Sequence, residues 1–305
     1  MSFVRCVRRV VQGLVALLLI AGPCRGDSSG PDLASYYDRH MAIVDGAAFG
    51  WTGSGQPKRL RDGVKQVGVS NDSYLALTAD GVLLRWSGEA RDATPLMSGV
   101  ASFASGRTGV FAIDTGRALW HIGPNGTPRR VAADVVAASI GDGADYYVTS
   151  EGSLHVKGNA NRGQYGDGRL LPTAEFVRTA DDAVDVKAHT GHAIYLARNG
   201  DVLGTGGNIF GPLSTHGLGD KATRWGRIFD AAMGVATGAS HTAAIRRDKT
   251  LWIWGAGYGP APRKVLDNVT TVAAGSGDTI ARTADGALWQ WEAGKAPRRI
   301  EPGPR

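Results

Sequence analysis

Two histidines occupy matching positions in similar stretches of the chain, which makes them the first candidates for chemistry. His192 and His241 each open an apolar segment and are 49 residues apart. Histidines repeated in this way could bind a metal or transfer protons. The alternative is that each imidazole hydrogen-bonds to backbone between neighbouring structural units and recurs because the unit recurs. We favour the structural interpretation. Since the other five histidines show no ligand spacing, the sequence predicts no metal site.

Acidic residues form a second candidate site. Asp181, Asp182 and Asp185 could act as paired carboxylates in acid–base chemistry. They lie at a boundary between repeated segments, however, where acids commonly cap turns. The segment 141–145, Gly-Asp-Gly-Ala-Asp, has some likeness to a calcium loop but lacks the further oxygen ligands and the closing Glu, so a plain turn is favoured. These patterns predict no catalytic residue and no cofactor.

Two long loops carry the residues that we interpret as a partner-binding site. They span residues 159–173 and 208–225 and hold several aromatic and cationic side chains. Binding residues are commonly found on loops held by a rigid scaffold, and exposed aromatic and arginine residues are frequent interface anchors. The alternative is that these side chains fill gaps against neighbouring segments. The candidate partner-binding residues are Arg162, Tyr165, Phe210, His216, Arg224 and Trp225.

The elements that must hold these loops recur seven times along the chain. Each repeat has a hairpin turn followed by an apolar strand, and successive apolar anchor residues are 35, 36, 35, 48, 49 and 37 residues apart. Turns such as Asp45-Gly46 and Asn199-Gly200 favour a type I′ turn, which has positive φ at both central residues. The seven anchors are Ala48, Leu83, Leu119, Leu154, Val202, Leu251 and Leu288.

This repetition indicates the fold class. Four-stranded units of about 35 to 50 residues, repeated around an axis, are the sequence form of a β-propeller. The predicted fold is therefore all-β, a seven-bladed β-propeller of four-stranded antiparallel blades, forming a single domain over residues 35–303. Alternate loops of a meander emerge at the same end, so both long loops are expected on one face.

Two of the repeats contain a more specific motif. Residues 158–168 read GNANRGQYGDG and residues 206–213 read GGNIFGPL. Together they resemble the G-x-N-x-x-G signature, continued by Q-x-G-x-G, of the regulator of chromosome condensation repeat family. The second copy keeps the motif asparagine as Asn208, whereas the first has Ala160 in its place. The resemblance covers nearly the whole chain after its first segment, although most repeats lack the long loop.

The resemblance implies a seven-bladed propeller but leaves the function open. The eukaryotic founder of the family is a nuclear guanine-nucleotide exchange factor that also binds nucleosomes. A secreted bacterial relative is a proteinaceous β-lactamase inhibitor, and many other bacterial members have no assigned role. No exchange-factor or inhibitor motif is present in this chain, so no functional residue is carried over from these relatives.

The first 26 residues have the pattern of a secretory signal peptide. Arg5, Arg8 and Arg9 precede an apolar run over 10–22, and small or bend-forming residues follow. The apolar run is too short for a comfortable membrane span. We therefore expect a signal peptide over 1–26, a secreted or periplasmic protein, and no membrane span in the mature form.

Removal of this segment changes the charge and cysteine content. The whole chain carries a formal charge of +6, but the leader holds four arginines and no acid, which leaves +2 for the remainder. That balance gives no indication of nucleic-acid binding. Both cysteines, Cys6 and Cys24, also lie in the leader, so the remainder can form no disulfide and no thiolate site.

These observations favour an exported, non-catalytic, monomeric propeller that binds a protein partner of unknown identity. Binding is expected at the face that carries the two long loops. One alternative is a carbohydrate-active or other enzyme with its site at the mouth of the central channel. A further alternative is a protein similar to a β-lactamase inhibitor.

Overall fold

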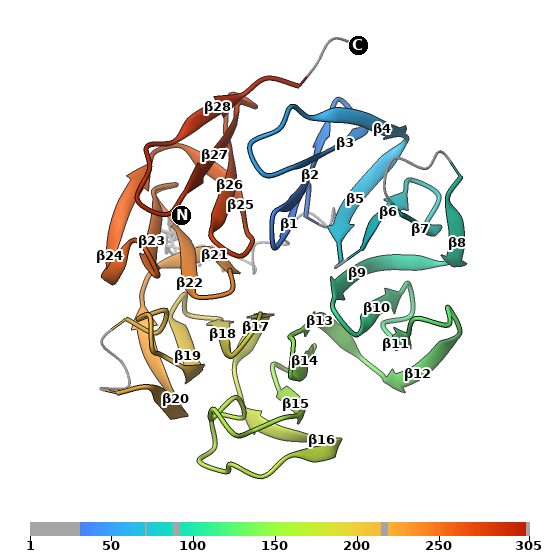
Figure 1. Ribbon diagram of the computed structural model, residues 1–305. Coiled ribbons are helices and arrows are strands. Elements are labelled where there is room, and N and C mark those ends of the chain that lie inside the picture. Colours follow the sequence, from blue (N-terminus) through green and yellow to red (C-terminus); the bar gives the residue numbers. More distant parts are fainter. Residues whose placement is uncertain (1–30, 71, 88–91, 215–218, 303–305) are drawn as a thin grey trace, which may run out of the picture.

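A ring of seven sheets makes up the protein, seen along its axis in Figure 1. The computed structural model describes residues 31–70, 72–87, 92–214 and 219–302. Each sheet is a four-stranded antiparallel meander of consecutive strands, and no helix occurs among the described residues. The predicted all-β, seven-bladed propeller is confirmed. Its first strand begins at Leu33, two residues before the predicted start of the domain at residue 35, and the expected signal peptide over 1–26 lies outside the described residues.

The blades follow one another along the chain. Blade 1 contains β1 (Leu33–Tyr36), β2 (Arg39–Val44), β3 (Ala47–Thr52) and β4 (Lys58–Asp62). Blade 2 contains β5 (Val64–Val69), β6 (Ser73–Thr78), β7 (Leu83–Ser87) and β8 (Thr94–Met97). Blade 3 contains β9 (Val100–Gly106), β10 (Gly109–Asp114), β11 (Leu119–Ile122) and β12 (Pro128–Ala132). Blade 4 contains β13 (Val135–Ile140), β14 (Ala144–Thr149), β15 (Leu154–Gly158) and β16 (Thr173–Ala180).

The second part of the ring has the same order. Blade 5 contains β17 (Ala183–Ala188), β18 (His192–Ala197), β19 (Val202–Gly207) and β20 (Lys221–Phe229). Blade 6 contains β21 (Ala232–Thr237), β22 (His241–Arg246), β23 (Leu251–Gly255) and β24 (Gly259–Leu266). Blade 7 contains β25 (Val269–Ala274), β26 (Asp278–Thr283), β27 (Leu288–Glu292) and β28 (Arg298–Ile300).

All seven predicted hairpin turns join the second strand of a blade to the third, but the expected turn type is wrong for six of them. Only the turn at Asp45-Gly46 has positive φ at both residues, 50° and 75°. In blade 2, Gly81 N donates to Thr78 O and Thr78 N donates to Val82 O, both at 3.0 Å. That pattern is a three-residue loop whose last residue alone is left-handed. The other five turns repeat this pattern, so the first residue of each pair precedes the left-handed residue and does not share its conformation.

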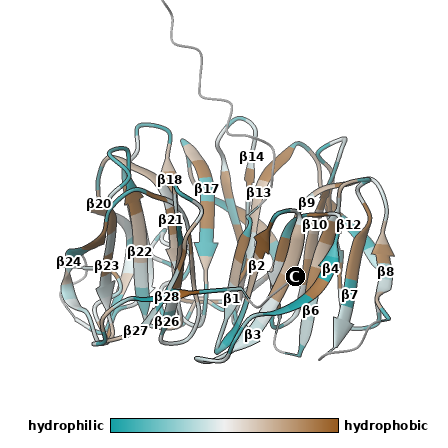
Figure 2. Cartoon of the chain, turned by 90° about the horizontal axis from the view of Figure 1, so that it is seen from above, coloured by the Kyte–Doolittle hydropathy of each residue, from teal (hydrophilic) through white to brown (hydrophobic). Residues whose placement is uncertain are grey.

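Apolar cores lie between neighbouring blades rather than within one sheet. The cluster between blades 5 and 6, for example, joins Ile194 and Val202 to Ala244 and Trp254, all with no exposed surface. In Figure 2 the strands run between the two faces of the disc, with the connecting loops at the two ends. Each blade is therefore held by its neighbours, and loops at either end can vary without opening the core.

Side chains close the ring, because no strand is exchanged between the first and last blades. Arg282 Nε of blade 7 lies 2.5 Å from Asp32 Oδ2, which precedes β1. Trp51 Nε1 of blade 1 donates to Gln290 Oε1 of blade 7 at 3.1 Å, and both side chains are buried. The closure thus rests on apolar packing and on hydrogen bonds between residues more than 230 positions apart.

Candidate functional site

The first long loop joins β15 to β16 and lies on the next blade. It begins after Gly158, whose φ is 105°, and a Cβ at that position would lie 2.5 Å from Gly143 O. Only glycine fits such a left-handed residue in close contact with backbone. The loop is tied to blade 5 through Thr205, whose Oγ1 donates to Gly163 O at 2.8 Å. We call residues 159–172 insertion 1.

The second long loop joins β19 to β20 and reaches blade 6 in the same way. Asn208, the motif asparagine, accepts a hydrogen bond from Leu213 N at its Oδ1, 3.0 Å away. Pro212 O accepts a hydrogen bond from Trp254 Nε1 of blade 6 at 2.7 Å, and Leu213 is fully buried. We call residues 208–220 insertion 2. The described part of both insertions is therefore fixed by buried hydrogen bonds.

Two of the predicted partner-binding residues are part of this internal support. Tyr165 has no exposed surface, and its hydroxyl donates to Gly158 O at 2.8 Å and accepts from Thr173 N at 2.9 Å. Trp225 is half-buried and packs edge-on against Tyr195, with ring centroids 4.9 Å apart. The expected exposure of Tyr165 is wrong, and the alternative that loop aromatics fill gaps between blades describes both residues.

Exposed apolar side chains gather on the two insertions. Phe210, a predicted partner-binding residue, is 59% exposed, and its neighbour Ile209 is 68% exposed. Insertion 1 adds Leu170 and Leu171, which are 41% and 78% exposed. These four account for most of the seven large exposed hydrophobic residues found in the described parts of the chain. Sequence reasoning missed the two leucines and Ile209, although adjacent apolar residues in a loop were a readable signal.

The two insertions contact each other. Lys221 Nζ, at the end of insertion 2, donates to Asn161 O of insertion 1 at 3.3 Å. Arg162 is exposed and lies over Gly191, where a Cβ would be 2.8 Å from its Nη1. The same side chain also lies beside Gly207, two residues before Ile209. We define the insertion surface as the exposed side chains of Arg162, Leu170, Leu171, Ile209, Phe210 and Lys221.

The remaining predicted partner-binding residues are Arg224 and His216. Arg224 is exposed and follows insertion 2, but its guanidinium lies against insertion 1, where a Cβ on Gly168 would be 3.2 Å away. Residues 167 and 224 also form an isolated antiparallel bridge. His216 lies outside the described residues. Of the predicted set, the structure brings Arg162, Phe210 and Arg224 to accessible positions around the two insertions.

The paired histidines connect neighbouring blades. His192 Nε2 of blade 5 lies 3.3 Å from Thr242 Oγ1 of blade 6, and His241 Nε2 lies 3.0 Å from Thr279 Oγ1 of blade 7. Burial lowers the pKa of His192 to about 3 and that of His241 to about 4. Both imidazoles are neutral at pH 7. Each contacts a threonine side chain of the next blade, and His192 also makes the expected hydrogen bond to backbone of that blade, at His241.

The candidate carboxylates do not converge. Asp181 pairs with Arg178, Asp182 lies 3.3 Å from Arg198 Nε, and Asp185 lies 2.7 Å from Lys187 Nζ. Each acid therefore has its own cation, an arrangement typical of surface and turn stabilisation. In the parts of the chain that the structure describes, no group of three or more His, Cys, Asp or Glu residues is placed to hold a metal ion.

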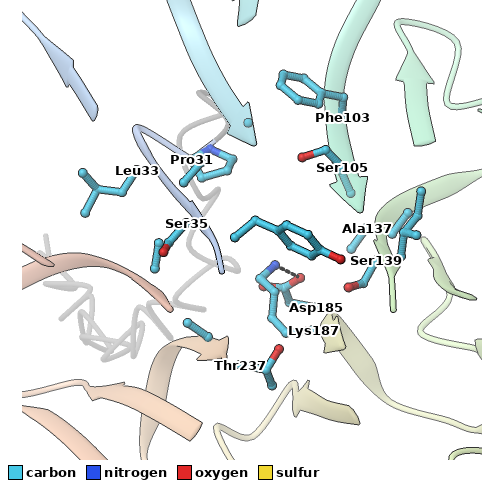
Figure 3. Close-up of a pocket in the computed structure, with 18 of the residues that line it drawn as sticks. Pro31, Leu33, Ser35, Phe103, Ser105, Ala137, Ser139, Asp185, Lys187 and Thr237 are labelled. Atoms are coloured by element: carbon cyan, nitrogen blue, oxygen red, sulfur yellow. Dashed lines mark hydrogen bonds and ion pairs between the residues drawn. The ribbon is translucent and has the colours of Figure 1, made fainter. Parts of the chain in front are cut away.

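A cavity of about 310 Å³ occupies the central channel between the first strands of the blades. Figure 3 shows Ser105, Ser139 and Thr237 around it, together with the ion pair of Asp185 and Lys187. Small residues dominate these strands, as expected where seven sheets converge. The lining combines a few hydroxyl groups with the ion pair of Asp185 and Lys187 and with the buried imidazole of His189, whose pKa is lowered by burial.

One end of the channel is crossed by side chains from three blades. Tyr36 OH of blade 1 donates to Asp142 Oδ1 at 2.7 Å, and its ring stacks on His189 with centroids 5.1 Å apart. Tyr37 OH and Thr190 Oγ1 both donate to Asp142 Oδ2 at 3.3 Å. The segment at residues 141–143 is thus a plain turn, and its Asp142 carboxylate accepts hydrogen bonds from tyrosine and threonine hydroxyls. The crossing lies on the same face as the insertions.

No helix that is long and apolar enough to cross a membrane occurs in the described part of the chain.

Comparisons with known proteins support the fold. No family model and no curated protein matches the chain. Among solved structures, Prp20p from Saccharomyces cerevisiae, studied for its binding to Gsp1p and histones, has a TM-score of 0.69 at 14% identity, covering 82% of this chain and 81% of that chain. Yeast RCC1 (Prp20) bound to Kap60 has a TM-score of 0.55 at 16% identity, with 88% and 74% covered.

A third similar structure comes from a plant. The CRINKLY WD40 ectodomain of the Arabidopsis thaliana receptor kinase ACR4 has a TM-score of 0.61 at 15% identity, covering 90% of this chain and 98% of that chain. At these identities the similarity is one of fold. The chain shares the seven-bladed propeller architecture of yeast RCC1, which is the fold that the G-x-N-x-x-G motif implied.

Proposed function

We propose that this chain is exported and acts as a non-catalytic propeller that binds a protein partner through the insertion surface. The observation that carries the proposal is the gathering of exposed apolar side chains on insertions 1 and 2. Adjacent exposed apolar residues cost free energy in water unless a partner covers them, and such patches commonly mark interaction sites. Export is supported by the basic and apolar pattern of residues 1–26.

The described parts of the insertions are suited to binding because they are held in place before a partner arrives. Asn208 fixes the start of insertion 2, and Pro212 accepts a hydrogen bond from the next blade. In insertion 1, Gly163 O accepts a hydrogen bond from Thr205 of blade 5. Loops that are already ordered lose little conformational entropy on association, so more of the contact free energy appears as affinity.

Similar structures support a binding role. Prp20p is described for its binding to Gsp1p and histones, and yeast RCC1 has been solved with Kap60 bound. These are properties of those proteins, and they show that this fold can present protein-binding surfaces. The enzyme alternative has less support, because Asp181, Asp182 and Asp185 are each paired with a cation and the channel is crossed by Tyr36.

The test is differential capture with matched variants. The wild-type protein, I209S/F210S and M233S are immobilised and exposed to the proteins of the compartment into which the host exports the chain. Met233 is a suitable control because it is 51% exposed and is the second residue of β21, at the end of blade 6 away from the insertions. We expect one protein to be captured by wild type and M233S and lost with I209S/F210S. Equal capture by all three would exclude the insertion surface.

A further inference from the structure

We infer that the insertion surface recognises an acidic protein segment, one that presents carboxylates beside a large apolar side chain. This inference rests on the proposed function and adds the chemistry of the partner. It starts from the charges around Ile209 and Phe210. Arg162 lies beside Gly207, two residues before Ile209, and Lys221 follows insertion 2 and contacts Asn161 of insertion 1. Two cations therefore lie at the base of the loop that carries the exposed apolar pair.

Neither of these two cations has an acidic partner in the described part of the propeller itself. Some exposed cations, such as Arg129 and Arg130, likewise have no ion pair with a described residue, whereas many others are matched by nearby carboxylates, as in Arg59 with Asp62 at 2.6 Å and Lys264 with Asp267 at 2.6 Å. Arg162, in contrast, has no carboxylate within ion-pair distance among the described residues, and the same holds for Lys221, whose ammonium group donates to a carbonyl oxygen. The insertions therefore present positive charge that the propeller itself does not neutralise.

The position of Arg162 is set by small residues. Its side chain lies against Gly191 and Gly207, and a Cβ on either glycine would fall 2.8 or 3.6 Å from it. Gly207 is separated from Ile209 only by Asn208, so the guanidinium stem lies at the base of insertion 2. A carboxylate that pairs with Arg162 would therefore hold its neighbours close to the loop that carries Ile209 and Phe210. Guanidinium groups bind carboxylates through two parallel hydrogen bonds, which also orients the partner.

The net charge of the two loops agrees with an acidic partner. Together, residues 159–173 and 208–225 contain four cationic and two acidic side chains. One acid, Asp167, is 2.7 Å from Arg169 Nε, and the other, Asp220, precedes Lys221 and is exposed. The apolar pair supplies affinity by removing surface from water, whereas the cations supply orientation and speed of association.

The experiment is selection of peptides from a phage-displayed library of random twelve-residue sequences on the purified protein. Enriched peptides are synthesised and their affinities measured for wild type, R162E/K221E, F210A and R129E/R130E. The last variant is the matched control, because Arg129 and Arg130 are exposed on β12 of blade 3 and the same charge change is made there. Thermal unfolding of each variant confirms that the propeller is folded.

We expect the enriched peptides to place Asp or Glu next to Leu, Phe or Trp. R162E/K221E should weaken their binding by about tenfold or more, and R129E/R130E by less than about twofold, since only the first pair lies beside the apolar contact. Raising the salt concentration should weaken wild-type binding and leave R162E/K221E little changed.

Neutral or basic peptides that bind through Phe210 and tolerate R162E/K221E would overturn the acidic partner while leaving the proposed function in place. Peptides insensitive to both F210A and R162E/K221E would contradict the inference and the insertion surface together. Absence of any enriched peptide would count against recognition of a linear acidic segment.

Discussion

Tyr36 and Asp142 are hydrogen-bonded across the propeller axis at 2.7 Å, although 106 residues separate them in the chain. One belongs to blade 1 and the other to the turn between β13 and β14 of blade 4. Asp142 also accepts from Tyr37 and Thr190, so blades 1, 4 and 5 meet at one carboxylate. This contact spans the ring, whereas the interblade cores join only neighbours.

Removing this contact should weaken the whole propeller. A hydrogen bond to an ionised group contributes about 1.5–3 kcal/mol, and Tyr36 is buried, so we expect Tyr36→Phe to lower the free energy of unfolding by about that amount. Tyr37→Phe is the control: its hydroxyl is 3.3 Å from the carboxylate and its side chain is exposed. Urea unfolding curves measure both. A Tyr36→Phe variant as stable as wild type would show that the cross-axis hydrogen bond adds nothing.

Ring closure should depend on the pair between Arg282 and Asp32. Both groups are less than one-third exposed and join the last blade to the residue before the first strand. We expect Arg282→Ala to lower the free energy of unfolding by about 3 kcal/mol, because it leaves Asp32 without its cation. Arg59→Ala removes an exposed pair within blade 1 and should cost at most about 1 kcal/mol. Similar losses in both variants would contradict a special role for closure.

The motif glycines should tolerate substitution worse than the turn glycines. Gly206 has a φ of 101°, and a Cβ there would lie 2.5 Å from Gly191 O. Gly286 has a φ of 85° with open space around its Cβ position. Gly206→Ala combines backbone strain of about 1–3 kcal/mol with a clash, and Gly286→Ala has strain alone. The melting temperature should fall further for Gly206→Ala than for Gly286→Ala. Equal decreases in melting temperature would show that the close approach of position 206 to Gly191 O is unimportant.

Stability should fall as pH decreases below about 6.5. The pKa of His192 is lowered to about 3 and that of His241 to about 4, so between pH 6.5 and 4 the unfolded chain binds two protons that the folded chain does not. Each uncompensated proton changes the free energy of unfolding by about 1.4 kcal/mol per pH unit. Burial raises the pKa of Asp145 to about 6, which opposes this trend by one proton between about pH 4 and 6.

Between about pH 4 and 6 the free energy of unfolding therefore still decreases as the pH falls. Urea unfolding at pH 7, 6 and 5 measures it, and His192→Gln should reduce the slope by about one proton because glutamine does not titrate. A variant whose pH dependence matched that of wild type would show that His192 is not the buried neutral imidazole of the structure.

Local chemistry made the fold predictable. The seven turns and anchors depend on residues close in sequence, so Leu83 and Leu251 could be assigned to third strands without knowledge of their neighbours in space. The turn type was not predictable from Asp-Gly pairs, because the left-handed position also accepts Arg117 and Lys249. Recognising it required the hydrogen-bond pattern of the loop.

The candidate site was only partly predictable. Phe210 and Arg162 were identified because aromatic and arginine residues in long loops are frequent anchors, and both are exposed. The burial of Tyr165 depends on how insertion 1 is held against blade 5, which no local pattern encodes. The cross-axis pairing of Tyr36 with Asp142 likewise arises only once seven blades close into a ring.

We propose above that a partner binds at the insertion surface. The most direct measurement is site-specific photo-crosslinking in the host, with a benzophenone amino acid at position 210 or, as control, at position 233. Both positions are more than half exposed, on different ends of the propeller. We expect a single crosslinked protein from position 210 that is absent from position 233. A crosslink from position 233 alone, or the same products from both positions, would contradict it.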